Sequence, residues 1–165
     1  ILRLIIASII LLSIIITIIS LFIPPDVRLS KTVQINASEE SVMNQISDPG
    51  NWKNWYPNSN SSKFYYENDS IKGLILDEQK GLSIVIAGAK KSDEVTAIYN
   101  LRGKKIPTGW QITSVQNSNS VTVLWYIDFH LRWYPWEKFT SFLFEKIYSP
   151  QLQQGLDNLK SFVEK

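Results

Sequence analysis

The sequence predicts an α+β fold, in which a curved antiparallel sheet is wrapped around a long C-terminal helix and preceded by one N-terminal transmembrane helix. Three observations predict it. Residues 1–23 carry one charge, Arg3, and contain no Pro, Gly, Asn, Gln, Asp, Glu or Lys. From Lys63 to Trp133, apolar and polar residues largely alternate, as they do in half-buried strands. Residues 150–163 then carry apolar residues at helical spacing.

The N-terminal segment is long enough to cross a bilayer. Leu4 to Ile23 is uncharged, and its twenty residues would span roughly 30 Å as a helix. Pro24 and Pro25 stop the helix, because proline has no N–H and disfavours helix in the residue before it. We therefore predict a single-pass membrane anchor over residues 1–25, with membrane contact through residues 1–23, and one domain over residues 26–165.

Two alternatives to an anchor stay open. A cleaved signal peptide has an apolar run of about 7–15 residues before small residues, and a buried soluble helix has an apolar run of about 10–14. The run here is longer and leads into Pro24 without small residues at a cleavage site. Arg3 lies on one side of the segment, and Arg28 and Lys31 lie on the other, so charge does not assign the side of the membrane. Because no Met opens the chain, a few further residues are expected before Ile1.

Composition excludes several classes of function. Outside the anchor, basic and acidic residues nearly balance and form no basic stripe, which argues against nucleic acid as a partner. The chain has no cysteine, so it cannot form a disulfide, a thiolate zinc site or a cysteine nucleophile. His130 is the one histidine, so a His-rich metal site cannot be built in one chain. We predict no metal and no cofactor.

The first elements of the domain have local signals. Residues 27–35 alternate and predict a strand that starts close to the membrane. Ser38 is a good N-cap, and the acidic residues after it suit the first turn of a short helix. Asp48-Pro49-Gly50 ends that helix. Trp52 and Trp55 follow at a spacing that places both on one side of a helical turn.

The middle of the chain predicts a run of antiparallel strands joined by short turns. The last one is the clearest, because Trp125, Ile127 and Phe129 share one face while Asp128 and His130 share the other. This alternation indicates a sheet with one covered face and one wetter face. The predicted strands are Lys63–Glu67, Ser70–Asp77, Gly81–Ala87, Glu94–Leu101, Gly109–Gln116 and Ser120–Trp133.

The C-terminal region predicts two helices in succession. The first covers Trp136–Tyr148, and a second begins at Ser149 and Pro150, with serine as N-cap and proline at the first position. Gly155 lies beside the apolar stripe of the second helix. Since a glycine within a helix costs about 1 kcal/mol against alanine, we expect a close approach there to the sheet or to a ligand.

Three strings in this order resemble the SRPBCC (START-like, polyketide cyclase/dehydrase) superfamily. Residues 33–42 are similar to its strand-to-helix string "INAPPEKV", residues 51–57 to its "NWxxWxPW" turn, and residues 155–160 to its "GLxNLK" ending. The whole chain is similar to bacterial members that carry one N-terminal membrane helix. The resemblance implies the helix-grip fold, and it implies fold more strongly than function. The family's glycine- and tryptophan-rich middle strands are reduced here to short strings around Gly73 and Gly81.

An excess of large aromatic residues predicts an apolar pocket, because ligand pockets are lined by aromatic side chains with few polar groups. For any single residue the alternative is plain core packing. The candidate ligand-binding residues are Trp52, Trp55, Phe64, Trp110, Trp125, Phe129, Trp133, Phe139 and Phe142.

No catalytic residue is predicted. Asp128, His130 and Arg132 point the same way along one strand, and a histidine between an acid and a base could act in acid–base catalysis. The opposite face of that strand is the apolar one, however, so these three side chains are expected to face solvent.

The resulting hypothesis is a membrane-anchored domain that binds a hydrophobic or lipid-like small molecule without turnover. One alternative is a cyclase/dehydrase- or hydrolase-like enzyme that uses the same cavity, which would require His130 to point inward. Another is a protein-interaction domain with a filled core, which a cavity below about 300 Å³ would favour.

Overall fold

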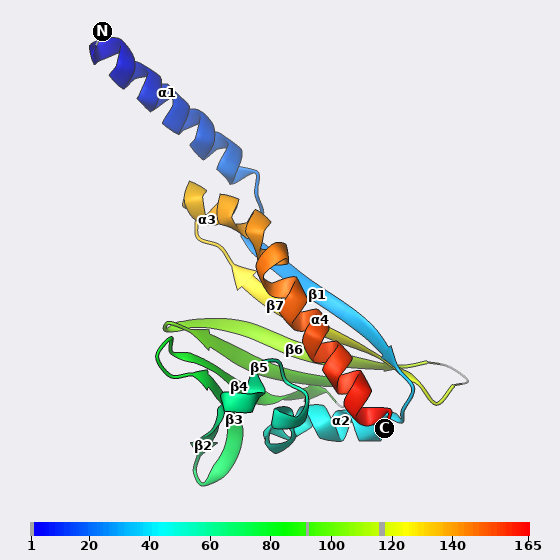
Figure 1. The fold of residues 1–165 in the computed structure, drawn as a ribbon. Coiled ribbons are helices and arrows are strands. Elements are labelled where there is room, and N and C mark those ends of the chain that lie inside the picture. Colours follow the sequence, from blue (N-terminus) through cyan, green and yellow to red (C-terminus); the bar gives the residue numbers. More distant parts are fainter. Residues whose placement is uncertain (1, 92, 116–117) are drawn as a thin grey trace.

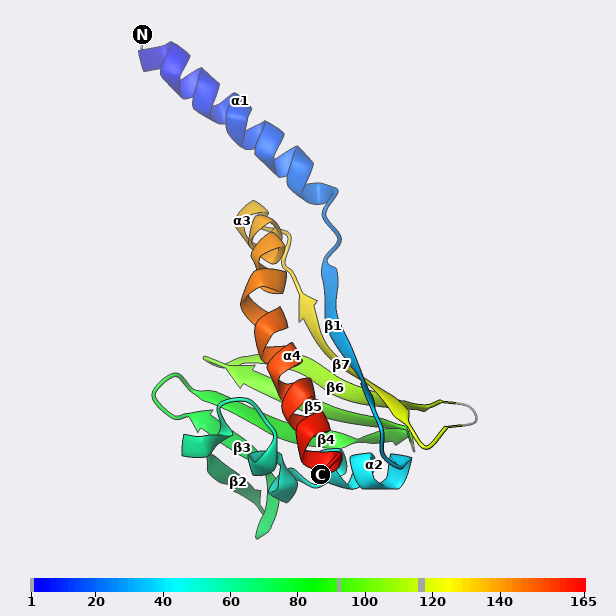
Figure 2. The ribbon, with the colours of Figure 1, turned by 45° about the vertical axis from the view of Figure 1, so that its right-hand side comes forward.

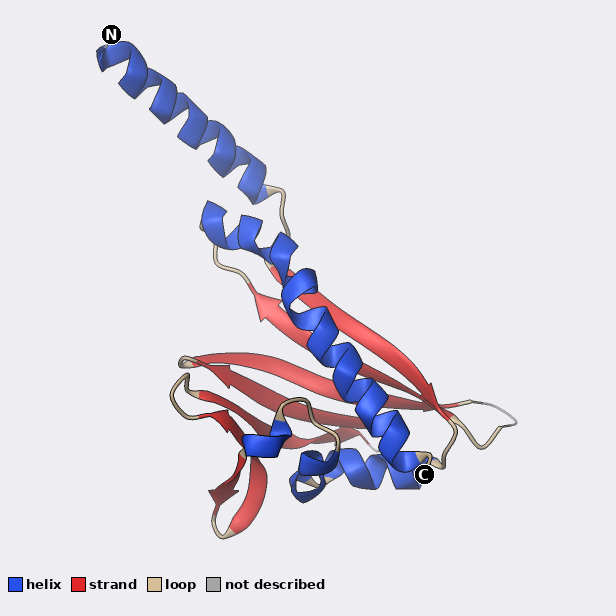
Figure 3. Cartoon of the chain, in the orientation of Figure 1, coloured by secondary structure: helices blue, strands red, loops and turns tan. Residues whose placement is uncertain are grey.

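A seven-stranded antiparallel sheet curves around the long C-terminal helix α4, as Figures 1 and 3 show. The computed structural model describes residues 2–91, 93–115 and 118–165. The strand order is β1-β7-β6-β5-β4-β3-β2, and every neighbouring pair is antiparallel. The predicted fold class is therefore confirmed. The strands are β1 (Asp26–Ile35), β2 (Lys63–Glu67), β3 (Ser70–Asp77), β4 (Leu82–Lys91), β5 (Glu94–Leu101), β6 (Lys104–Ser114) and β7 (Val121–His130).

The helices lie at the two ends of the chain and between β1 and β2. They are α1 (Leu2–Leu21), α2 (Glu39–Ser47), α3 (Pro135–Thr140) and α4 (Phe144–Val163), with short 3₁₀ turns at Pro49–Asn54, Ser59–Ser61 and Ser141–Leu143. Ser38 caps α2 as predicted, since its hydroxyl accepts a hydrogen bond from the Ser41 N–H at 3.3 Å. In the described part of the chain, α1 is the helix that is long and apolar enough to cross a membrane.

The core lies between the concave face of the sheet and α4. Trp125 and Ile127 of β7 face it, and Leu152, Leu156 and Leu159 of α4 face them in turn; all five are buried. Alternation along β7 thus predicted the covered face correctly, because successive side chains of a strand point to opposite faces of a sheet.

Gly155 marks a close approach of α4 to the sheet. A Cβ atom at this position would lie 2.3 Å from Cζ3 of Trp125 and 2.9 Å from the ring of Pro57. The expectation of a close approach to the sheet is confirmed, and only a residue without a side chain fits there.

The prediction of a new helix at Ser149 was wrong, because α4 runs through this point with Pro150 inside it. Pro150 cannot donate to the carbonyl of Lys146, and both residues are exposed, so water can take the place of the missing N–H. The Ser149 hydroxyl is buried and has no hydrogen-bond partner among the described residues, so it does not act as a cap.

Two strands end at other residues than predicted. β4 continues to Lys91, beyond the predicted end at Ala87, and β7 ends at His130 rather than Trp133. The predicted end of a strand at Gln116 lies outside the described residues.

β6 begins at Lys104 instead of Gly109, although it contains Pro107. β6 pairs with β5 from Lys104 onward, but with β7 only from Thr108 onward. A proline is tolerated in a strand where its missing N–H faces no partner. Pro107 meets this condition because β7 has already left β6 at that level.

Candidate ligand-binding site

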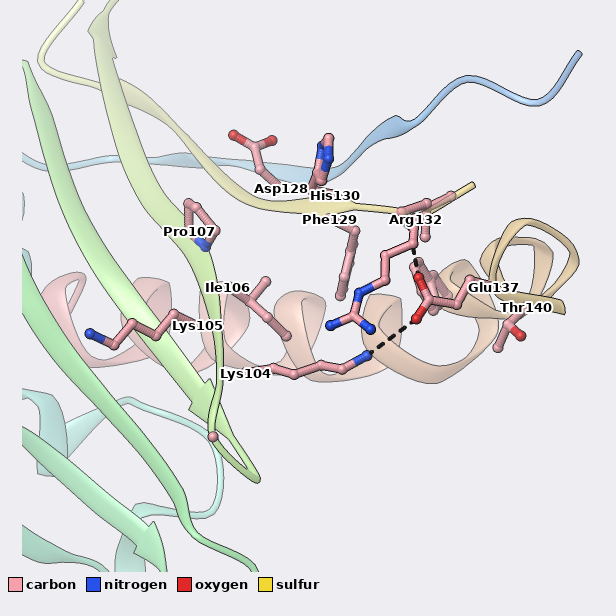
Figure 4. Close-up of a pocket in the computed structure, with 13 residues that line it drawn as sticks. Lys104, Lys105, Ile106, Pro107, Asp128, Phe129, His130, Arg132, Glu137 and Thr140 are labelled. Carbon is pink, nitrogen blue, oxygen red and sulfur yellow. Dashed lines mark hydrogen bonds and ion pairs between the residues drawn. The ribbon is translucent and has the colours of Figure 1, made fainter. Parts of the chain in front are cut away.

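The sheet divides at the end nearest α1, and the division opens a cavity. Residues 104–107 of β6 pair with β5 alone, whereas residues 128–130 of β7 pair with β1 alone. Figure 3 shows β1 and β7 rising away from the rest of the sheet. The space between the two halves has a volume of about 560 Å³, and residues of the β5–β6 turn, β7, α3 and α4 line it. Figure 4 shows these side chains.

One wall of the cavity is apolar. Phe129 points from β7 toward α4, where its ring centroid lies 4.3 Å from that of Phe144 and 5.0 Å from that of Tyr148. Ile106 and Leu131 are buried in the same lining. This wall offers the kind of surface that an acyl chain or a ring system contacts.

The rim of the cavity is basic. Glu137 accepts a hydrogen bond from the backbone N–H of Arg132 at 2.8 Å, and its other oxygen lies 3.8 Å from Nζ of Lys104. Among the described residues, the side chains of Arg132 and Lys105 form no ion pair. Two cations without a carboxylate partner therefore border the same space as the apolar wall.

The opposite face of β7 carries further polar residues, of which Asp128 and His130 also border the cavity. Arg28 donates two hydrogen bonds of 2.6 Å to Asp128, which raises the pKa of the Arg28 guanidinium. His130 is exposed, and its Nδ1 lies 2.7 Å from Oδ1 of Asp26. In Figure 4, Asp128 and His130 lie on the side of β7 away from Lys104 and Ile106, as the alternation predicted.

Tyr126 has a perturbed pKa on this outer face. Burial, together with a 2.8 Å hydrogen bond from its hydroxyl to Glu94, raises the pKa of Tyr126 to about 12. The unfolded chain holds a tyrosine at its ordinary pKa of about 10. The folded state thus favours the neutral phenol, and this contribution to stability is complete below pH of about 10 and lost as the pH rises through about 12.

We expect Tyr126→Phe to reduce the dependence of the free energy of unfolding on pH in this alkaline range. Between pH values of about 10 and 12, the wild type should lose stability that the variant does not lose. Urea unfolding at a series of alkaline pH values measures the difference, and the other tyrosines and lysines titrate equally in both proteins. Parallel curves for the two proteins would contradict the assignment.

The structure places four of the predicted site residues in the core and not in the cavity. Neighbouring indole centroids lie 5.3–6.3 Å apart. Three indoles donate hydrogen bonds to protein oxygens, as Trp125 does to Oγ1 of Thr108 at 3.0 Å. Nε1 of Trp110 is buried without a partner among the described residues. These four are Trp52, Trp55, Trp110 and Trp125.

The other five predicted residues are dispersed. Phe129 lines the cavity. Phe64 lies on β2, where Nζ of Lys53 is 4.3 Å from its ring centroid. Trp133, Phe139 and Phe142 are exposed around α3.

Sequence reasoning missed most of the cavity lining. Ile106, Leu131 and Phe144 supply its apolar wall with Phe129, and Lys104, Lys105 and Glu137 supply its rim with Arg132. Pro107, two residues after the lysine pair, was the available signal, because a proline within a strand marks a place where pairing is lost.

Comparison with known proteins agrees with this architecture. The family model described as "Polyketide cyclase / dehydrase and lipid transport" matches residues 26–164. No curated relative matches the chain.

Solved structures share the fold at low sequence identity. The Zhui aromatase/cyclase from Streptomyces sp. R1128 is 11% identical with a TM-score of 0.63, over 84% of this chain and 94% of that one. A point mutant of norcoclaurine synthase from Thalictrum flavum is 12% identical with a TM-score of 0.61, over 84% and 94%. A START superfamily protein from Mycobacterium smegmatis is 18% identical with a TM-score of 0.57, over 83% and 97%.

These likenesses confirm the resemblance to the SRPBCC superfamily. At such identities the solved structures establish the fold alone, whereas the family model spans nearly the whole region after the N-terminal helix. The chain therefore belongs to the polyketide cyclase / dehydrase and lipid transport family.

Proposed function

We propose that residues 26–165 bind a hydrophobic, lipid-like molecule without turnover, and that residues 1–25 anchor this domain to a membrane. The observation that carries the proposal is the cavity of about 560 Å³, which has an apolar wall and opens at the end of the domain nearest α1. Cavities of about 300–1,000 Å³ are typical of small-molecule sites. The family description, which names lipid transport, supports the same class of ligand.

The segment after α1 is bound directly to the cavity walls. The N–H of Leu131 donates to the carbonyl of Pro25 at 2.7 Å, and Nζ of Lys138 donates to the carbonyl of Ile23 at 2.7 Å. Leu131 lines the cavity, and Lys138 follows Glu137 of its rim. If α1 spans a bilayer, the cavity lies within a few residues of the lipid, where an apolar ligand is concentrated.

The rim suggests that the ligand is an amphiphile with an anionic group. Each Å² of apolar ligand surface that is buried against the Phe129 wall contributes roughly 25 cal/mol to the free energy of binding. Arg132 and Lys105 supply the positive charge that a carboxylate or phosphate would meet. A neutral lipid would contact the apolar wall and form no ion pair with these cations.

A matched pair of ligands tests this proposal. With purified residues 26–165, a long-chain fatty acid and the fatty alcohol of equal length should both displace an apolar fluorophore. We expect Arg132→Gln to weaken binding of the fatty acid about 10-fold. A charged hydrogen bond contributes about 1.5–3 kcal/mol to binding, and partial exposure to solvent reduces this contribution. The alcohol should bind equally to both proteins.

Lys146→Gln is the control, because Lys146 is exposed on α4 and does not line the cavity. Native mass spectrometry of the same domain should show a co-purifying lipid. Failure of both ligands to displace the fluorophore, together with a ligand-free mass, would overturn the binding proposal.

His130 does not favour the enzyme alternative. His130 borders the cavity, but its ring points to the outer face of β7, where it is hydrogen-bonded to Asp26. An acid–base residue must instead reach a substrate held against the Phe129 wall.

A further inference from the structure

Large exposed apolar side chains gather on one short segment of the domain. Among the described residues after Pro25, the large apolar side chains that are exposed lie between Trp133 and Ile147, apart from Tyr66 and Phe162. We call this group the aromatic surface; it consists of Trp133, Trp136, Phe139, Phe142 and Leu143. Exposed fractions of 66% at Trp136 and 69% at Phe142 show that the protein itself leaves these rings uncovered.

The rings form two groups on this segment. Tyr134 lies between Trp133 and Trp136, with ring centroids 4.8 Å and 4.9 Å away, and the second pair is stacked. Phe139 and Phe142 lie 6.4 Å apart on the next turns. Large exposed apolar side chains gathered on one segment of a soluble domain mark an interaction site.

The position of the aromatic surface identifies what covers it. α3 lies beside the C-terminal end of α1 in both views, and the two helices are in contact (Figures 1 and 2). The buried Lys138 of α3 fixes this arrangement by donating to the carbonyl of Ile23. A helix of twenty residues spans about 30 Å, the thickness of the hydrocarbon layer, so the end of α1 lies at the membrane surface. The aromatic surface lies at the same level.

The residue types of this segment suit the interface between the lipid and water. Tryptophan and tyrosine concentrate at membrane interfaces, because their rings are apolar and carry one polar group. Lys104, Lys105 and Arg132 lie next to the segment, around the cavity rim, and basic side chains near a membrane attract anionic headgroups.

We propose that the aromatic surface inserts into the headgroup region of the bilayer that α1 crosses, and so holds the mouth of the cavity against the lipid. The inference rests on the proposed anchor. It adds a second contact with the membrane, made by side chains. Two contacts would fix the orientation of the domain on the membrane, whereas a single helix with a short link would not.

Spin labels on the full chain in nanodiscs of phosphatidylcholine and phosphatidylglycerol test the proposal. Because the chain has no cysteine, each variant carries one label. Trp136→Cys reports on the aromatic surface, and Phe142→Cys repeats the measurement at a second exposed site. Glu67→Cys, on the exposed end of the β2–β3 hairpin, is the matched control, and Ile10→Cys reports on the middle of α1.

Collisions of each label with oxygen, which concentrates in lipid, and with a water-soluble nickel complex report its depth. At positions 136 and 142 we expect several-fold fewer nickel collisions than at position 67, together with more oxygen collisions. Water-like values at 136 and 142 with a lipid-like value at 10 would overturn this inference and leave the anchor intact. A water-like value at 10 would overturn the anchor itself. Labels at 136 and 142 that are shielded from both reagents would show a protein partner on the surface, which also overturns the inference.

Discussion

Trp125→Ala is expected to lower the free energy of unfolding by about 3–5 kcal/mol, the usual cost of removing a large aromatic side chain from a packed core. Trp125 is 2% exposed. Its ring centroid lies 5.3 Å from those of Trp110 and Tyr56, and its indole N–H donates to Thr108. Alanine would leave a cavity at the centre of the aromatic cluster, and it would leave the Thr108 hydroxyl without this partner.

Urea unfolding of residues 26–165, followed by circular dichroism, measures this loss. Trp136→Ala is the matched control, because Trp136 is 66% exposed and should change stability by less than about 0.5 kcal/mol. The comparison also separates the two interpretations of the core tryptophans. If Trp125 lined a ligand site instead of the core, the ligand-free domain would tolerate its removal, and equal stabilities of the two variants would show this.

Gly155→Val has the second large expected effect, a loss of about 2–3 kcal/mol from overpacking. The first carbon of the new side chain would lie 2.3 Å from the ring of Trp125 and 2.9 Å from Pro57. Neither neighbour can move easily, since Trp125 is held by the aromatic cluster and Pro57 belongs to the turn that carries Trp52 and Trp55. α4 would have to shift away from the sheet.

Gln154→Val provides the control for this variant. It introduces the same β-branched residue into the same helix at an exposed position, so it reports the cost of helix propensity without the clash. Gly155→Ala should fall between the two in stability, because it adds the clash of one carbon and gains about 1 kcal/mol of helix propensity. A Gly155→Val protein as stable as Gln154→Val would mean that α4 does not approach Trp125 as closely as described.

Two different things decide whether an aromatic residue lines the cavity: the face of its own strand and the neighbours of that face. The alternation of β7 predicted that Phe129 faces inward and His130 outward, and both do. Its period of two depends only on the local backbone. Whether an inward ring meets a ligand or another ring depends on neighbours from distant parts of the chain. Trp110 on β6 meets Trp52 from the turn after α2, so both are core residues.

Several elements could be predicted from the sequence because they obey local rules. The twenty-residue length of α1, the Ser38 cap and the faces of β7 each follow from one stretch of residues and its backbone geometry. The position of the cavity and the residues around it depend instead on contacts between distant segments. β7 leaves β6 at Thr108 to follow β1, and α3 folds back against the end of α1. Both depend on pairings between segments about a hundred residues apart, whose register no local pattern encodes.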